Sequence, residues 1–328
     1  MQAIIMDGYG PADVLRPAEV EEPRMRGNDL LVRVRAAGVN RADVLQRQGM
    51  YAEQPLADSE LLGLELAGEV VAVGEGVSGF APGARVMGLV GGGAYAGLAR
   101  MDAGLAMPVP EGLDFVHAAA IPEVFVTAHE ALFHLGRLER GETALIHAAA
   151  GGVGSAAVQL AHAAGARVLA TASAGKLGRV AEFGADVGID HRSEDFAERV
   201  RTETNGAGAD VVVDFVGGPY FGPNLDSLAE GGRLVQVGLL GGAAAEIDLG
   251  KLLQRRLRIF GTVMKSRSQE DKRAMVRRFA ERWLDRFGDG TLRPVVGRVF
   301  PLDRAADAHR YMESNAGVGK ILLSMEEG

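Results

Sequence analysis

The sequence contains no cysteine, and this absence narrows the chemistry available to the protein. Without cysteine the chain forms no disulfide, no cysteine-ligated iron–sulfur cluster and no thiolate zinc site, and it has no cysteine nucleophile. Lysine is scarce as well, so arginine supplies nearly all of the 35 positive charges, against 43 Asp and Glu residues and a net charge of −8. This balance argues against a nucleic-acid-binding protein.

Long apolar runs are also lacking, and the first residues show no basic region before an apolar segment. We therefore expect neither a membrane-spanning helix nor a signal peptide, and we predict a soluble, cytoplasmic protein. Glycine, in contrast, is abundant, at 46 of 328 residues, which indicates many tight turns or close backbone approaches. The length suggests about two domains.

The spacing of apolar residues changes along the chain. The first third has short β-like runs separated by Gly and Pro, which is typical of an all-β or barrel-like unit. From Thr143 onward, apolar runs alternate with helix-compatible stretches; the runs are 143–149, 167–171, 187–190, 210–216, 233–238 and 257–263. Continuous apolar strands joined by helices predict a doubly wound α/β unit with a parallel sheet. The tail ends in a predicted strand, 320–324, that can return to the first domain.

The sharpest local feature is a glycine turn between an apolar strand and a helix, in residues 145–160. Gly151 and Gly154 fit the last two glycines of G-x-G-x-x-G, with Ala149 in the first place and Gly152 and Val153 between them. A bare backbone lets a pyrophosphate approach the helix N-terminus, and Gly154 allows close packing of helix and strand. The segment predicts dinucleotide binding; the alternative is a tight turn without a ligand.

The cofactor preference is indicated by a missing carboxylate. NAD sites place Asp or Glu about 20 residues beyond the motif, yet residues 169–176 contain neither. Ser173 and Lys176 instead offer a hydroxyl and an ammonium group suited to a 2′-phosphate, and His191 and Arg192 add to them. We therefore predict NADPH; the alternative is that Lys176 is simply solvated.

Several motifs together resemble one known family. They are Gly38-Val39-Asn40-Arg41-Ala42-Asp43, Gln46-Arg47-Gln48-Gly49-Met50-Tyr51, Gly63-Leu64-Glu65 with Gly68, Ala119-Ala120-Ile121-Pro122-Glu123, and the glycine turn. The chain resembles, over nearly its whole length, the zinc-independent medium-chain dehydrogenases/reductases of the quinone oxidoreductase (zeta-crystallin-like) type. The first two motifs and Ile-Pro-Glu are most similar to the tumour-suppressor-inducible quinone oxidoreductase branch.

The resemblance implies a domain organisation. A GroES-like, β-rich catalytic domain would comprise residues 1–122 completed by 265–328, and a Rossmann NADPH-binding domain would comprise 123–264. A homodimer would form through the last Rossmann strand, about 257–263. Zinc-dependent relatives hold the metal with cysteine and the histidine of Gly-His-Glu; here Leu64 takes the place of that histidine, so we predict no metal site.

The resemblance also implies roles for individual residues. Tyr51 would donate a hydrogen bond to a quinone oxygen, or else be a loop aromatic; Asn40 would face the nicotinamide or the acceptor, or else cap a turn. Further cofactor contacts would come from Thr127 near the nicotinamide, Phe215 and Val216 beside the adenosine half, Gly238 and Leu239 at the fifth strand, His191 near the 2′-phosphate and Lys320 from the returning tail. In similar human-type enzymes a serine stands where this chain has Gly151.

These observations predict an NADPH-dependent quinone oxidoreductase that transfers hydride without a metal. One alternative is an NADPH-dependent 2-alkenal or enoyl reductase, because the same hydride geometry serves a carbon–carbon double bond. The other is an NADPH-binding protein with little turnover. The expected partners are a small quinone or enone and a second copy of the chain, with no nucleic acid and no membrane.

Overall fold

The computed structural model describes residues 1–50 and 59–325. The chain divides into two compact units, the first made of Met1–Val126 and Lys265–Gly328, the second of Thr127–Met264. The first boundary lies inside helix α3 (Pro122–His129), between Val126 and Thr127, a few residues after the boundary predicted at residue 122. In the described residues, no helix is both long and apolar enough to cross a membrane.

The first unit is built on a sheet of seven strands, most of them antiparallel. Its strand order is β14-β15-β3-β4-β5-β7, and β6 pairs with β3 outside this path. The strands are β3 (Asp29–Val39), β4 (Glu65–Val73), β5 (Arg85–Leu89), β6 (Leu98–Asp102), β7 (Ala106–Pro108), β14 (Val296–Pro301) and β15 (Lys320–Ser324). A separate hairpin-like pair consists of β1 (Gln2–Met6) and β2 (Leu15–Glu19).

Alternating burial explains why β3 forms in the centre of this sheet. Leu30, Val32 and Val34 are buried in one core cluster that also includes Leu66. Opposite Val34 stands Gly68, where a side-chain carbon would lie 2.0 Å from the carbonyl oxygen of Arg33. A glycine is therefore required for β3 and β4 to approach this closely.

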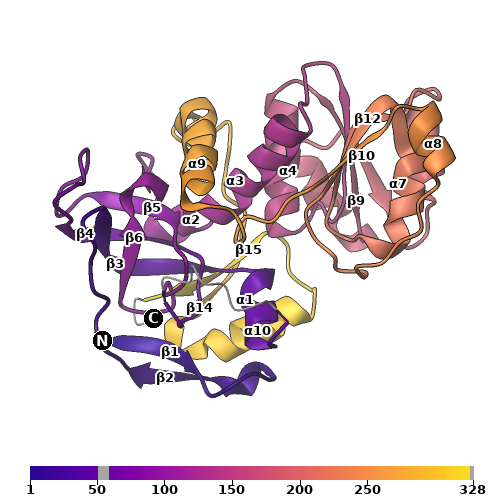
Figure 1. Ribbon diagram of the computed structural model, residues 1–328. Helices are drawn as coiled ribbons and strands as arrows, with labels where there is room; N and C mark the ends of the chain where they lie inside the picture. Colours follow the sequence, from indigo (N-terminus) through magenta and orange to yellow (C-terminus); the bar gives the residue numbers. More distant parts are fainter. Residues whose placement is uncertain (51–58, 326–328) are drawn as a thin grey trace. The chain divides into compact units, whose positions relative to one another are not determined.

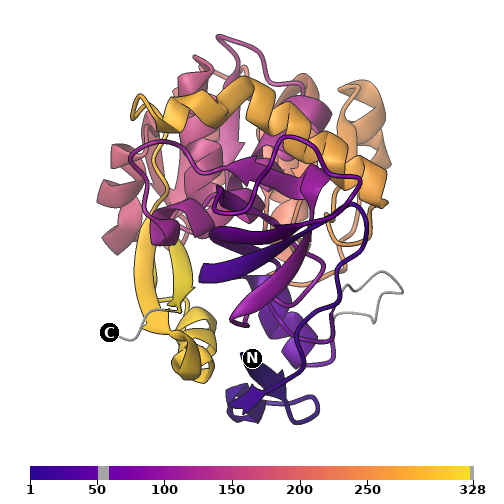
Figure 2. The ribbon, with the colours of Figure 1, turned by 90° about the vertical axis from the view of Figure 1, so that its left-hand side faces the viewer.

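The C-terminal tail completes the first unit. Strand β15 pairs antiparallel with β3, with Ile321 opposite Val39, and Figure 2 shows the yellow tail strands on the same sheet as the indigo strands. This register places Lys320, the first residue of β15, beside Asn40, which follows β3. The helices of this unit are α1 (Arg41–Arg47), α2 (Phe115–Ala119), α9 (Gln269–Trp283) and α10 (Ala305–Glu313).

The second unit contains a six-stranded parallel sheet in the order β10-β9-β8-β11-β12-β13. Its strands are β8 (Thr143–Ile146), β9 (Arg167–Ala172), β10 (Val187–Asp190), β11 (Ala209–Asp214), β12 (Leu228–Gln236) and β13 (Arg258–Gly261). Its helices are α4 (Gly152–Ala163), α5 (Leu177–Glu182), α6 (Phe196–Glu203), α7 (Phe221–Ser227) and α8 (Leu249–Gln254). Figure 1 shows α4 on one face of this sheet and α7 and α8 on the other.

The strand order confirms the predicted doubly wound architecture. The chain runs outward from β8 through β9 to β10, and then returns to the other side of β8 with β11. Ligands of such sheets bind at the carboxyl ends of the strands, next to this reversal. We therefore expect a ligand to contact residues that follow β8, β9, β10, β11 and β12.

Candidate functional site

The glycine loop connects β8 to α4 at the point where the strand order reverses. Ala148 adopts the left-handed conformation, with φ of 46°, and the N–H of Gly151 donates to the Ala148 carbonyl at 2.9 Å to close a turn. A side-chain carbon on Gly154 would lie 2.3 Å from that same carbonyl oxygen, so only glycine lets the helix pack against the turn. The first N–H groups of α4 have no acceptor within the helix, which makes this end suited to an anion.

The predicted loop residues are placed together by this turn. Ala149 is buried and donates its N–H to the Thr171 carbonyl at 3.0 Å, while Gly152 and Val153 form the half-buried start of α4. Gly151 is exposed at the N-cap of α4. A side-chain carbon there would lie 3.3 Å from the nearest atom, the Ala148 oxygen, so this glycine is sterically less restricted than Gly154.

A positively charged corner lies at the ends of β9 and β10. Ser173 follows β9, and the N–H of His191, which follows β10, donates to the Ala172 carbonyl at 3.2 Å. Lys176 lies one short turn further on, and its pKa is lowered by partial burial and by the charge of Arg192. Two cations close enough to affect one another form a suitable place for a phosphate.

Two carboxylates also lie at this corner, and Glu194 Oε1 accepts the N–H of Asp190 at 2.8 Å. Asp190, the last residue of β10, accepts hydrogen bonds from the Ser193 hydroxyl at 2.7 Å and from the Arg192 N–H at 3.2 Å. These bonds lower the pKa of Asp190, with the Ser193 hydroxyl having the largest effect. The Asp190 carboxylate thus stabilises the turn that follows β10.

The segments after β11 and β12 are joined by backbone hydrogen bonds. The N–H of Leu240 donates to the Phe215 carbonyl at 3.1 Å, and the N–H of Gly241 donates to the Val216 carbonyl at 2.7 Å. A side-chain carbon on Gly238 would lie 3.0 Å from the Phe215 oxygen. The structure therefore brings the predicted residues Phe215, Val216, Gly238 and Leu239 together at the carboxyl edge of the sheet.

The hydroxyl group of Thr127 is unpaired among the described residues. Its Oγ1 atom is buried, yet it has no hydrogen-bond partner among the described residues. Buried hydroxyl groups are nearly always paired, so an unmatched one indicates that something else binds there. An unpaired hydroxyl is compatible with the predicted contact between Thr127 and the cofactor, and that contact stays a prediction.

In the first unit, three buried side chains form one hydrogen-bonded group. The Lys320 ammonium lies 2.6 Å from Glu65 Oε1 and donates to Asn40 Oδ1 at 2.7 Å and to the Val39 carbonyl at 2.9 Å. Asn40 Nδ2 donates to Glu65 Oε1 at 2.9 Å, and the N–H of Glu123 donates to Glu65 Oε2 at 2.8 Å. We call Asn40, Glu65 and Lys320 the interior ion-pair group.

This geometry bears on two of the predicted site residues. All three N–H groups of Lys320 have acceptors inside the first unit, so its predicted cofactor contact would require one of these bonds to be exchanged. The amide of Asn40 is likewise used on both of its polar atoms, by Glu65 and Lys320. The predicted contact of Asn40 with nicotinamide or acceptor stays a prediction. Tyr51 lies outside the described residues.

Two further carboxyl groups beside this group have raised pKa values. Burial raises the pKa of Asp43 to about 6, although the Asn40 N–H and the Lys320 charge oppose the effect. Burial, and then the charge of Glu65, raise the pKa of Glu123 to about 8. Glu123 therefore holds a proton near neutral pH, which sequence reasoning did not anticipate.

The position of the missing zinc ligand is occupied by a packed leucine. Leu64 is buried beside Glu65 at the start of β4. Within residues 1–50 and 59–325, no group of three or more His, Asp or Glu side chains is arranged to hold a metal ion.

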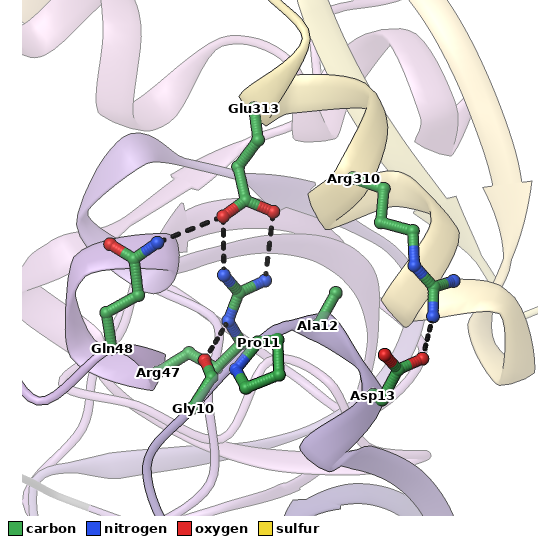
Figure 3. A pocket seen from close by; sticks show the side chains of 8 residues that line it. All are labelled: Gly10, Pro11, Ala12, Asp13, Arg47, Gln48, Arg310 and Glu313. Atoms are coloured by element: carbon green, nitrogen blue, oxygen red, sulfur yellow. Dashed lines mark hydrogen bonds and ion pairs between the residues drawn. The ribbon is translucent and has the colours of Figure 1, made fainter.

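A pocket of about 360 Å³ lies elsewhere in the first unit (Figure 3). The buried Arg47 in its lining donates from Nη2 to Glu313 Oε1 at 2.6 Å, and Arg310 pairs with Asp13. Because both of these guanidinium groups are already paired with carboxylates, they offer little to an anionic ligand, and we assign the pocket no function.

Comparisons with known proteins agree with this architecture. The family model "Alcohol dehydrogenase GroES-like domain" matches residues 26–111, and the model "Zinc-binding dehydrogenase" matches residues 152–281. A quinone oxidoreductase of Rattus norvegicus is 33% identical over 98% of this chain and 97% of its own length.

Solved structures show the same fold. The quinone oxidoreductase of Escherichia coli, complexed with NADPH, is 31% identical, with a TM-score of 0.89 over 99% of this chain and 100% of that chain. The CurK enoyl reductase is also 31% identical, with a TM-score of 0.88 over 99% of both chains.

A GroES-like unit and a doubly wound unit with a glycine loop define a class of two-domain oxidoreductases. The chain belongs to the medium-chain dehydrogenase/reductase family, in which quinone oxidoreductases are among its relatives. This confirms the resemblance stated from the sequence, together with the predicted fold class.

Proposed function

We propose that the protein is an NADPH-dependent quinone reductase that works without a metal. The observation that carries the proposal is the carboxyl edge of the parallel sheet, where the glycine turn at the N-terminus of α4 lies next to a corner with Lys176 and Arg192. The first suits a pyrophosphate and the second a 2′-phosphate. The relatives named quinone oxidoreductase, one of them in complex with NADPH, support the same assignment.

The residues of the second unit bind and orient the cofactor in this proposal. The N-terminus of α4 would hold the pyrophosphate, Ser173, Lys176 and His191 would bind the 2′-phosphate, and the Thr127 hydroxyl, which has no partner among the described residues, would bond a polar group on the nicotinamide side. When bound, NADPH supplies the hydride, so the protein's part is placement and polarisation. Tyr51 is proposed as the hydrogen-bond donor to the acceptor oxygen, and Asn40 as a residue that faces the nicotinamide or the acceptor.

The absence of a metal from the reaction is part of the proposal. Leu64 supplies no ligand atom, the chain has no cysteine, and the charge of Glu65 is compensated by Lys320 at 2.6 Å. A quinone suits such a site because it accepts hydride with only hydrogen-bond assistance. Dialysis against a strong chelator is expected to leave the turnover rate unchanged.

An enoyl or 2-alkenal reductase is the second candidate. The CurK enoyl reductase has the same fold at 31% identity, and Glu123, whose pKa is raised to about 8, holds a proton of the kind that reduction of a carbon–carbon double bond requires. The two candidates differ in the acceptor they reduce.

Initial rates with separate acceptors test these assignments. NADPH and NADH are each offered with a simple quinone and with a 2-alkenal, using chelator-treated protein. NADPH-selective quinone reduction is the expected result. Reduction of the alkenal alone would replace the first candidate by the second, and tight NADPH binding without turnover of either acceptor would indicate a binding protein.

We also propose a homodimer formed through β13. This strand lies at the edge of the parallel sheet, and several large apolar side chains before, in and just after it are exposed: Leu239, Leu240, Ile247, Leu249, Leu253, Ile259 and Val263. An exposed apolar sheet edge favours pairing with another chain, and a second copy of β13 would cover it.

Sedimentation analysis of matched variants tests the dimer. Ile259→Lys is expected to shift the protein from dimer to monomer, because the new charge would lie in the paired edge. Val299→Lys, on an exposed apolar residue of β14 in the other unit, is the control and is expected to stay dimeric. A wild-type monomer, or a dimeric Ile259→Lys, would contradict the proposal.

A further inference from the structure

A buried chain of polar side chains runs beneath the carboxyl edge of the parallel sheet. His147 Nδ1 lies 3.0 Å from Thr171 Oγ1, and His147 Nε2 lies 2.7 Å from Asn224 Oδ1. Asn224 Nδ2 donates to Asp214 Oδ2 at 3.0 Å. All four residues are buried, with 0 or 1% of their surface exposed. We call them the polar brace.

The direction of every hydrogen bond in the polar brace follows from Asp214. Its carboxylate only accepts, so Asn224 must present Nδ2 to it and turn Oδ1 toward His147. His147 must then carry its proton on Nε2, which leaves Nδ1 as the acceptor for the Thr171 hydroxyl. Burial lowers the pKa of His147 and so favours this neutral form. Each polar atom of the imidazole is therefore used.

Each end of the polar brace holds a turn of the candidate cofactor site. His147 directly precedes Ala148, the left-handed residue of the glycine loop, and the Thr171 carbonyl accepts the N–H of Ala149 in that loop at 3.0 Å. At the other end, Asp214 accepts the N–H of Val216 at 2.7 Å and that of Gly217 at 3.0 Å. The brace thus links the turns that follow β8 and β11, with Thr171 of β9 between them and the sheet.

We infer that His147 is a positioning residue for NADPH, which holds the pyrophosphate turn and the adenosine-side turn in one arrangement through Thr171, Asn224 and Asp214. The inference rests on the proposed function. It extends that function to residues that are not themselves predicted cofactor contacts but are bonded to two of them, Ala149 and Val216. A left-handed alanine is a strained conformation, and such a residue persists only where its surroundings fix it.

The test is cofactor titration of His147→Phe. Phenylalanine keeps a ring to pack edge-on against Phe196 and Tyr220, whose centroids lie 4.7 and 4.9 Å from that of His147, but it removes both hydrogen bonds. If the binding arrangement falls to about a tenth of the population, the Kd rises roughly tenfold. The increase is expected to be the same for NADPH and NADH, because both share the pyrophosphate.

Two further variants, His147→Gln and Thr171→Val, test the hydrogen bonds of His147 separately. His147→Gln restores an N–H donor toward Asn224 and is expected to recover part of the affinity. Thr171→Val removes a single hydroxyl from a strand position that suits a β-branched residue, and it carries the test if His147→Phe does not fold. It is expected to weaken both cofactors by a smaller, equal factor.

Binding and stability must be measured on the same samples. A lowered melting temperature with an unchanged Kd per folded chain would show that the polar brace only stabilises the fold, and would overturn the inference. A change in Kd for NADPH alone would assign the effect to the 2′-phosphate corner and would also overturn it. Failure of the wild-type protein to bind either cofactor would refute the proposed function itself.

Discussion

The replacement Lys320→Met tests the interior ion-pair group most sharply. The ammonium of Lys320 and the carboxylate of Glu65 are 4% and 0% exposed and lie 2.6 Å apart. Removing one partner of a buried pair costs about 3–5 kcal/mol, because the other charge stays buried without compensation. Asn40 Nδ2 and the Glu123 N–H still donate to Glu65, so we expect the lower end, about 3 kcal/mol.

Thermal unfolding followed by circular dichroism measures this loss. For a domain of the size of the first unit, about 1 kcal/mol corresponds to roughly 2–4 °C, so the Tm at which this unit of Lys320→Met unfolds is expected to fall by about 6–12 °C. Lys251→Met is the matched control: Lys251 pairs with Asp226 at the surface, where such a pair contributes at most about 1 kcal/mol.

A double variant separates loss of the charge balance from loss of packing. Lys320→Met combined with Glu65→Gln removes both charges and keeps a polar group of the same shape, so part of the lost stability is expected to return. If Lys320→Met unfolds at the temperature of the control, or if the double variant is less stable than the single one, the reasoning on this group is refuted.

Four further replacements test the remaining site residues. Lys176→Ala is expected to weaken NADPH by roughly 10- to 150-fold, the effect of one charge-assisted contact, and to leave the Kd of NADH nearly unchanged; equal losses would contradict a phosphate contact. Gly154→Ala is expected to lower the free energy of unfolding by roughly 1–3 kcal/mol and to weaken cofactor binding, because the added carbon would lie 2.3 Å from the Ala148 oxygen. Gly151→Ala is expected to have a smaller effect, because its added carbon would lie 3.3 Å from the same oxygen. Between its ordinary pKa of 4.5 and its raised value of about 8, Glu123 takes up a proton on folding, so wild-type stability is expected to fall as the pH rises through this window. Glu123→Gln is expected to flatten this pH profile in urea titrations, and parallel profiles would contradict the raised pKa.

Local patterns in the sequence were sufficient for much of the fold. The parallel strands were predicted from continuous apolar runs, and the glycine turn from Gly151 and Gly154, because both signals depend on residues close together in the chain. The ends of elements were less well predicted. The apolar run 143–149, for example, forms a strand only as far as Ile146, because the left-handed Ala148 already belongs to the turn of the glycine loop.

The interior contacts could not be predicted in the same way. Lys320 reaches Asn40 across 280 residues of sequence, and His147 reaches Asn224 across 77, so neither pair produces a local pattern. His147 lies in the apolar run 143–149, and a histidine near the end of such a run is the one local sign of a buried polar contact there. Only the folded topology, which aligns strand ends at one edge, shows that these polar groups meet.

The central claim is that hydride passes directly from NADPH to a quinone without a metal. The most direct measurement is single-turnover oxidation of NADPH, and of NADPH deuterated at the transferred position, followed by absorbance with a quinone and chelator-treated protein. The account predicts quinone-dependent oxidation that is slower with deuterium and unaffected by the chelator. Loss of the reaction on removal of metal, or the absence of quinone-dependent oxidation from protein that binds NADPH, would contradict it.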